Sequence, residues 1–241
     1  MSDAGVLRAE ETVGAECREP DPDHQEQQPG RVVISRDTVD SARGAGTCER
    51  GPMIPPLHAW GDESVRTHTA GQPRYLLAAS VVDSNDVEAS RALLEDLRPT
   101  RGKLHWHDLN DRQRKRVIAA VAEIDAVHLI VIAAPMDPRR EERARAVCLE
   151  RLGWELARQD VALLTLEQRA TALAARDLRV VEALRGRRII PASLRVEHGD
   201  PTAEPMLWLP DQVLGAFGAA SEGHPVPPSL SAAIETYDVE P

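Results

Sequence analysis

Between residues 57 and 220 the sequence alternates short, apolar, β-branched runs with longer segments whose apolar residues recur at helical spacing. Residues 127–134 are almost entirely apolar, which is typical of a strand buried at the centre of a sheet. In residues 85–97, Val87, Leu94 and Leu97 recur on one helical face. Strands that alternate with helices predict an α/β layer structure. Because a polar, glycine-containing turn joins the first two strands, we expect them to form an antiparallel hairpin, which would make the sheet mixed.

The alternation predicts one folded domain, residues 55–221, between two tails. The predicted strands are residues 57–63, 75–82, 127–134, 161–166 and 192–197, with a short extended segment at 103–107, and the predicted helices are 85–97, 109–124, 139–158, 173–185 and 206–220. Residues 1–54 are acidic and rich in proline and glutamine, so we expect them to bury too little apolar surface to become ordered. The proline-containing residues 222–241 are expected to be a second, flexible tail.

Two sequence features bear on the compartment. No apolar run approaches the roughly 20 residues needed to cross a bilayer, and residues 1–11 lack the apolar core of a secretory signal. The three cysteines, Cys17, Cys48 and Cys148, form neither a close pair nor a metal-binding spacing, so we expect free thiols. These features predict a cytoplasmic protein without a membrane partner, and they carry no signal for an oligomeric state.

The net charge of −10 argues against a nucleic-acid partner, because phosphate repels an acidic chain. The basic residues of the folded part nevertheless occur in clusters. One cluster lies on the predicted helix 109–124 and contains Arg112, Arg114, Lys115 and Arg116. Such a cluster forms either a solvated helix face or a surface that holds a phosphate backbone, and the charge leaves both interpretations open.

Several acidic residues end predicted strands or lie on an apolar helix. Asp62 and Glu63 end the first strand, where alternation puts only one of them on the same face as Trp60. Glu167 ends the strand 161–166, Asp200 follows the strand 192–197, and Asp211 lies in the apolar helix 206–220. Taken singly, each is explained by a helix cap or by a salt bridge to an arginine. Taken together, they supply the oxygen ligands that a divalent cation such as Mg²⁺ requires.

Five short motifs occur in a distinctive order. They are Asp62-Glu63-Ser64, the segment from Lys103 to Leu109, the segment from Leu166 to Arg169, Asp200, and the segment from Leu207 to Asp211. In these motifs residues 57–220 resemble the domain-of-unknown-function 3800 family, whose members look like ribonuclease H-fold proteins. The chain departs from that pattern at several positions. Val65 replaces a glycine, Lys103 stands where an acid is common, Glu167 replaces an aspartate, Pro201 and Thr202 replace Ser-Lys, and Trp208 and Pro210 replace Gln and Ala.

The resemblance implies a ribonuclease H-like α/β fold, a mixed sheet flanked by helices, with a metal site. It implies that Asp62, Glu167 and Asp211 bind one or two Mg²⁺ or Mn²⁺ ions, with Asp200 or Glu63 as a further ligand. These metals would support phosphodiester hydrolysis, and the basic cluster would then hold the nucleic-acid backbone.

Two histidines lie in the extended segment 103–107. His105 and His107 are expected to point to the same face, with Trp106 on the opposite one. His105 matches the histidine of the family pattern, which implies a catalytic role for it. A pair of surface or hydrogen-bonded structural histidines is the alternative.

Three functions follow from these features. The first is a metal-dependent nuclease that acts on RNA or DNA. The second is a catalytically inactive ribonuclease H-fold protein that binds nucleic acid or a protein partner. The third is a docking domain whose acidic tail binds a basic partner. Only the nuclease requires Asp62, Glu167 and Asp211 to converge.

Overall fold

The computed structural model describes residues 56–67, 72–99 and 102–241. They form a six-stranded mixed sheet with the order β5-β4-β1-β2-β3-β6. The strands are β1 (Leu57–Arg66), β2 (Arg74–Asp83), β3 (Ala126–Ala133), β4 (Val161–Glu167), β5 (Arg195–Gly199) and β6 (Ile234–Val239). β1, β2 and β3 pair antiparallel in sequence order, whereas β4 is added parallel to β1, and β5 parallel to β4. The prediction of a mixed sheet flanked by helices is confirmed.

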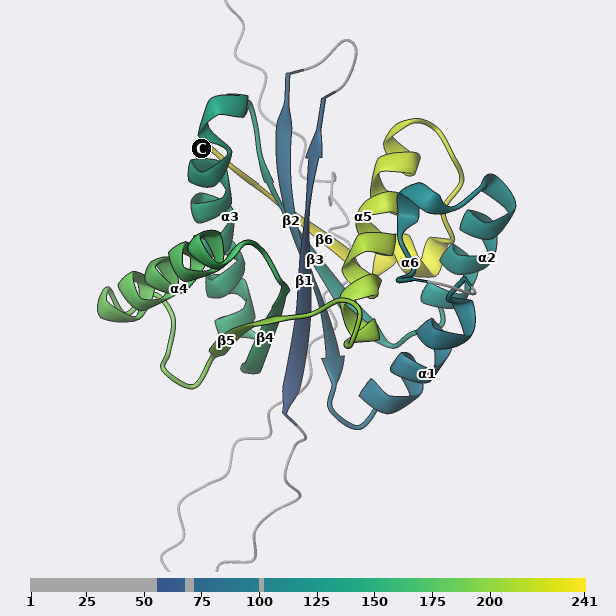
Figure 1. Ribbon diagram of the computed structural model, residues 1–241, viewed down its shortest axis with the longest axis horizontal. Helices are drawn as coiled ribbons and strands as arrows, with labels where there is room; N and C mark the ends of the chain where they lie inside the picture. Colours follow the sequence, from purple (N-terminus) through teal and green to yellow (C-terminus); the bar gives the residue numbers. More distant parts are fainter. Residues whose placement is uncertain (1–55, 68–71, 100–101) are drawn as a thin grey trace, which may run out of the picture. The chain divides into compact units, whose positions relative to one another are not determined.

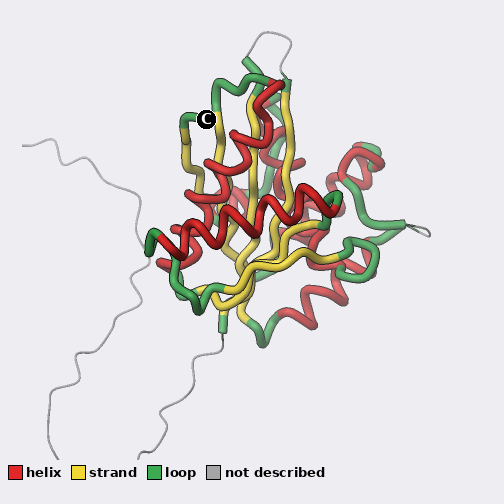
Figure 2. The backbone as a smooth tube through the Cα atoms, turned by 60° about the vertical axis from the view of Figure 1, so that its left-hand side comes forward, coloured by secondary structure: helices red, strands yellow, loops and turns green. Residues whose placement is uncertain are grey.

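Helices cover both faces of the sheet (Figure 1). They are α1 (Val87–Leu97), α2 (Asp111–Val121), α3 (Glu141–Arg158), α4 (Thr171–Gly186), α5 (Trp208–Ser221) and α6 (Pro228–Ala232), with 3-10 turns η1 (Trp106–Asp108), η2 (Pro138–Arg140) and η3 (Pro205–Leu207). α3 and α4 lie on one face, and α5 lies on the other with α1 and α2 packed beside it. Figure 2 brings the α3–α4 side forward, with these helices in red over the yellow strands. No helix of the described part is long and apolar enough to cross a bilayer.

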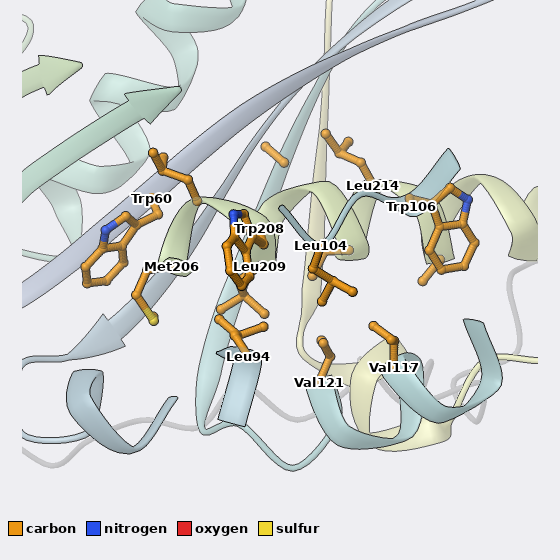
Figure 3. Close-up of a cluster of buried hydrophobic side chains, with 14 of the residues drawn as sticks. Trp60, Leu94, Leu104, Trp106, Val117, Val121, Met206, Trp208, Leu209 and Leu214 are labelled. Atoms are coloured by element: carbon orange, nitrogen blue, oxygen red, sulfur yellow. The ribbon is translucent and has the colours of Figure 1, made fainter. Parts of the chain in front are cut away.

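Alternation along β1 divides the apolar residues between two cores. Trp60 faces the core under α5, where it joins Leu94, Leu104, Trp106 and Trp208 (Figure 3). Ala59 faces the other core, under α3 and α4. Gly61, on the same face as Ala59, allows β4 to pack closely, because a Cβ atom there would lie 2.8 Å from Leu166 Cδ2. The close contact of β1 with β4 fixes where the ends of these two strands lie.

The C-terminal segment differs from the expectation of a flexible tail over residues 222–241. Residues 228–232 form α6, and β6 pairs parallel with β3 from Ile234 to Val239. The side chain of Leu230 is buried in the core beside α5. The sequence of β6 alternates weakly and contains polar residues, so its pairing depends on the exposed edge of β3 and has little local signal. The tail predicted at 1–54 lies outside the described residues.

Candidate metal and nucleic-acid site

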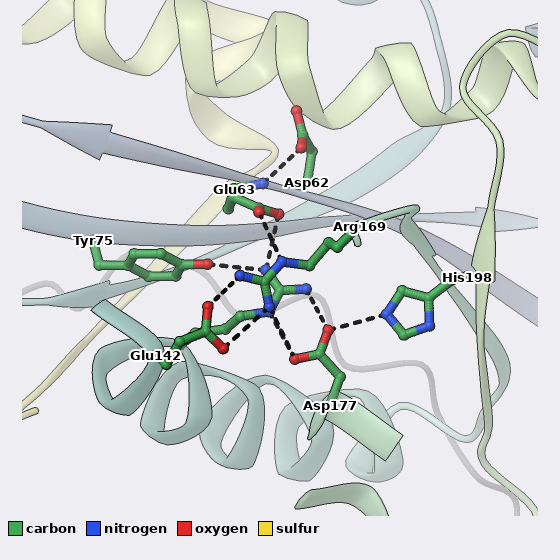
Figure 4. Close-up of polar contacts among 8 residues, drawn as sticks. Asp62, Glu63, Tyr75, Glu142, Arg169, Asp177 and His198 are labelled. Atoms are coloured by element: carbon green, nitrogen blue, oxygen red, sulfur yellow. Dashed lines mark hydrogen bonds and ion pairs between the residues drawn. The ribbon is translucent and has the colours of Figure 1, made fainter. Parts of the chain in front are cut away.

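The two acidic residues that end β1 point to opposite faces of the sheet. Figure 4 shows Asp62 on the side of β1 that faces α5 and Glu63 on the other side of the strand. Asp62 shares its face with Trp60, as alternation requires. Its only hydrogen bond in the described part of the chain is to the backbone N–H of Glu63, 2.8 Å from Asp62 Oδ1. The carboxylate of Asp62 is therefore available to a further partner.

Glu167 and Asp211 lie next to Asp62. β1 and β4 are parallel, and their last aligned pair is Gly61 with Leu166, so Asp62 and Glu167 are the next residues along the two strands. Asp211 comes from the first turn of α5, the helix that covers this face. Burial raises the pKa of Asp62 well above its usual value, and the negative charges of Glu167, Asp211 and Glu63 raise it further. The three carboxylates of Asp62, Glu167 and Asp211, which we call the acidic site, thus converge and repel one another.

A lysine neutralises part of this repulsion. Lys103 Nζ lies 2.7 Å from Glu167 Oε1, and both side chains are largely buried. Burial on its own would lower the pKa of Lys103, but the hydrogen bond and charge of Glu167, together with the charges of Asp62 and Asp211, raise it overall. The sequence marked this position as a departure from the family pattern, and the structure shows that the lysine enters the acidic site.

Asp211 is held by three hydrogen-bond partners. Asp211 Oδ2 accepts the backbone N–H of Trp106 at 2.8 Å, lies 3.2 Å from His105 Nδ1, and accepts Gln212 Nε2 at 2.9 Å. The rings of His105 and His107 are 5.4 Å apart, and both side chains line a cavity of about 330 Å³ together with the acidic site. The expected extended segment turns into η1 after His105, yet both histidines reach the same cavity.

The carboxylates fit a divalent cation in chemistry but are not arranged around one. Carboxylate oxygens are the ligands that Mg²⁺ and Mn²⁺ prefer. Among the residues that the structure describes, however, no group of three or more His, Cys, Asp or Glu side chains is placed so that it could hold a metal ion. For Glu167 to bind a cation, its ion pair with Lys103 would have to break.

Glu63 belongs to a different cluster, which sequence reasoning missed. Glu63 Oε2 accepts Arg145 Nη1 at 2.8 Å, and the same arginine forms a two-bond ion pair with Asp177. Arg169 and His198 complete the contacts of Asp177, at 3.4 Å and 3.0 Å (Figure 4). One sequence pattern could have indicated this cluster: Asp177 lies on the same helical face as the buried residues Val181 and Leu184.

Asp200 lies outside the acidic site. Its side chain accepts the backbone N–H and the hydroxyl of Thr202, both at 2.8 Å, in a turn after β5. The hydrogen bonds from Thr202 lower the pKa of Asp200. Neither Asp200 nor its neighbours line the cavity that contains Asp62, Glu167 and Asp211.

The four basic residues of the cluster on α2 do not all face the same cavity. Arg114 and Lys115 line a cavity of about 400 Å³ next to the acidic site, whereas Arg112 and Arg116 are exposed and do not line it. Arg66, the last residue of β1, lines this cavity as well. Sequence reasoning missed Arg66, because an arginine at the end of a strand carries no signal by itself.

No protein-family model matches the chain, and the comparison with curated proteins finds no match. Among solved structures, the chain is similar to ribonuclease HII in a complex with PCNA from Archaeoglobus fulgidus, with 12% identity, a TM-score of 0.42, and coverage of 69% of this chain and 74% of that chain. The chain is also similar to ribonuclease H2 from Pyrococcus horikoshii OT3, with 15% identity, a TM-score of 0.46, and coverage of 73% of this chain and 84% of that chain. A third similar structure is Bst-RNase HIII in complex with Mn²⁺, with 14% identity, a TM-score of 0.37, and coverage of 75% of this chain and 62% of that chain. At these identities and TM-scores the likeness says nothing of activity.

Proposed function

We propose that this protein is a metal-dependent nuclease that hydrolyses phosphodiester bonds in RNA or DNA. We also propose that it belongs to the domain-of-unknown-function 3800 family. The observation that carries the proposal is the convergence of Asp62, Glu167 and Asp211 at the ends of β1 and β4 and the start of α5. Lys103 offsets only part of the repulsion among these carboxylates, and a divalent cation would offset the rest.

The acidic site would hold Mg²⁺ or Mn²⁺ through Asp62 and Asp211, and through Glu167 once its ion pair with Lys103 is exchanged. A bound ion of this kind supplies an activated water and stabilises the leaving oxygen. His105 positions Asp211 through Nδ1, and no hydrogen bond of the described residues engages its Nε2. Because the Asp211 carboxylate can only accept, Nδ1 carries the ring proton, and Nε2 is available to accept a hydrogen bond from a group in the cavity.

Cleavage of labelled single-stranded RNA and DNA tests the proposal, with Mn²⁺, Mg²⁺ or EDTA present. We expect cleavage by the full chain with either metal, none in EDTA, and a loss of at least about 100-fold in Asp62→Asn. Asp96→Asn is the matched control, because Asp96 is exposed on α1 and removes the same charge elsewhere. Cleavage that persists in EDTA, or that Asp62→Asn leaves unchanged, would contradict the proposal.

The second candidate is a protein of the same fold that binds nucleic acid without cleaving it. The ion pair of Lys103 with Glu167 favours this candidate, since the ammonium group supplies a positive charge that a metal would otherwise supply. Saturable binding of an oligonucleotide without cleavage at millimolar Mn²⁺ would select it. The docking function depends on residues 1–54, which lie outside the described residues.

A further inference from the structure

We propose that the cavity lined by Arg66, Arg114 and Lys115, which we call the basic cavity, binds a phosphate group of a nucleic-acid strand beside the acidic site. The cavity has a volume of about 400 Å³ and lies between α2 and α5. The assignment rests on the proposed function, because it places the next part of the same substrate. It goes beyond that function by naming a second subsite and the residues that form it.

Arg66 is held in this cavity without a carboxylate partner. Arg66 Nη2 donates to the carbonyl oxygen of Leu214 at 2.7 Å, and its Nε atom is buried without a hydrogen-bond partner in the described part of the molecule. No acidic residue among those described lies within ion-pair distance of its guanidinium. A guanidinium without a carboxylate partner keeps its full positive charge, and an anion in the cavity would form a charge-assisted pair with it.

Two glycines of α5 make room for the cavity wall. A Cβ atom at Gly218 would lie 1.7 Å from Arg66 Nη1, and a Cβ atom at Gly215 would lie 2.0 Å from the Trp106 ring. The helix surface therefore allows the guanidinium of Arg66 to lie directly on the backbone. A larger residue at Gly218 would displace this group, which is the far end of a flexible side chain.

The α2 residues complete the positive wall. Arg114 stacks on Trp106 with its guanidinium carbon 5.0 Å from the ring centroid, and its Nε atom is also buried without a partner in the region that the structure describes. Lys115 is exposed at the rim. Trp106 is packed between Gly215 and Arg114, so its ring is not free to stack on a base. The basic cavity therefore suits a phosphate group, and phosphate contacts position a strand without reading its sequence.

Two carboxylates also line the basic cavity, and both are exposed to solvent. Asp111 is 93% exposed and lies 3.8 Å from Arg114, a distance at which an exposed pair contributes little. Glu222 is exposed at the end of α5, and its negative charge acts on Arg66 without forming an ion pair among the described residues. Three permanent cations thus face two solvated carboxylates, and His107 and His224 lie beside them.

The basic cavity and the acidic site are adjacent. Arg66, Trp106, His107 and Gly215 line both cavities. The backbone N–H of Trp106 binds Asp211, while its ring forms the wall of the basic cavity. A strand with its scissile phosphate at Asp62 and Asp211 would place a neighbouring phosphate against Arg66 and Arg114.

Binding of a 5′-fluorescein-labelled single-stranded oligonucleotide by the full chain tests the proposal, measured as anisotropy in EDTA over a range of salt concentrations. We expect Arg114→Gln and Lys115→Gln to weaken binding several-fold. The slope of the logarithm of the binding constant against the logarithm of the salt concentration should become shallower by about 0.7 for each phosphate that the protein no longer neutralises. Arg116→Gln is the matched control, because it removes the same charge from the same helix outside the cavity. Gly218→Ala should weaken binding without any change of charge, since it displaces Arg66.

Two results would overturn the proposal. One is equal weakening by Arg116→Gln and Lys115→Gln, which would mean that binding depends on net charge alone. The other is displacement by inorganic phosphate or a mononucleotide at the same concentration as the unlabelled oligonucleotide, which would make the ligand a free phosphate compound. Circular dichroism of each variant verifies folding. Binding is measured in EDTA, independently of any metal, so absence of cleavage in the separate assay with Mn²⁺ or Mg²⁺ would overturn the nuclease and leave this binding result intact.

Discussion

At the scale of single residues, Lys103 controls how much positive charge the acidic site still requires. Its ammonium group pairs with Glu167 and also interacts with the charges of Asp62 and Asp211. We expect Lys103→Met to bind Mn²⁺ about tenfold more tightly, because the cation then no longer competes for Glu167. Calorimetric titration measures this affinity. Lys115→Met is the control, because it removes the only other lysine of the chain and should leave the Mn²⁺ affinity within about twofold. An unchanged Mn²⁺ affinity in Lys103→Met would show that Lys103 does not compete with the metal.

Asp62 is a residue whose charge opposes folding when no metal is bound. Burial and the neighbouring carboxylates raise its pKa, so the charged form is less stable in the folded protein than in the unfolded chain at neutral pH. We expect Asp62→Asn to increase the free energy of unfolding in EDTA by about 1 kcal/mol. Urea denaturation at pH 7 measures the change, with Asp96→Asn as the control. A decrease in the free energy of unfolding would show that the carboxylate has a stabilising partner.

At the scale of elements, the ionic cluster around Asp177 joins β1, α3, α4 and β5. Burial on its own would raise the pKa of Asp177, but hydrogen bonds from His198 and Arg145 and the charges of Arg145 and Arg169 outweigh it and lower the pKa to about 2. A carboxyl with a lowered pKa stabilises the fold above its unfolded-state pKa of about 3.9, and this contribution is lost as the pH falls towards 2.

Asp177→Asn should therefore lower the free energy of unfolding most at neutral pH. We expect a pH-dependent part of roughly 2 to 3 kcal/mol that shrinks as the pH falls below about 4. Denaturation of both proteins at pH 7, 4 and 3 measures this difference. Glu182→Gln on the exposed side of α4 is the control. A difference of the same size at every pH would mean that the asparagine acts through packing alone.

The C-terminal strand protects the edge of the sheet. β6 supplies hydrogen bonds to β3 along six residues, and Leu230 of α6 fills the core. Deletion of residues 227–241 should lower the melting temperature by several degrees and promote association, because it exposes the edge of β3. Thermal unfolding and light scattering measure these effects. Deletion of residues 240–241, which lie beyond β6, should change neither, and equal behaviour of the two deletions would contradict a stabilising role for β6.

At the scale of the whole molecule, metal binding should be linked to global stability. A ligand that binds only the folded state stabilises it by about 2.7 kcal/mol at 100 times its dissociation constant. We expect the melting temperature to rise with Mn²⁺ concentration in the wild-type chain and to stay constant in Asp62→Asn. Differential scanning fluorimetry with Mn²⁺, Ca²⁺ and EDTA measures this linkage. A wild-type melting temperature that is independent of Mn²⁺ up to millimolar concentration would argue against the metal site.

Local periodicity was sufficient for most of the elements and for part of the site. Apolar runs and helical spacing predicted the strands β1 to β5 and the helices α1 to α5, because each of these segments must bury one face or both. The same patterning placed Asp62 and Glu167 at strand ends and Asp211 on a buried helix. Since parallel neighbours end at the same edge of a sheet, Asp62 and Glu167 come together because β4 pairs with β1, whereas Asp211 reaches them through the packing of α5.

Only the tertiary structure decided the contacts between segments far apart in the chain. The pairing of β6 with β3, the entry of Lys103 into the acidic site and the position of Arg66 on Gly218 each join residues more than 60 positions apart. Such contacts depend on which faces the packed elements present to one another, and the local sequence does not encode this. Asp62 and Glu63 illustrate the division: alternation along β1 placed them on opposite faces, and the packing of α5 and α3 decided which one reaches the acidic site.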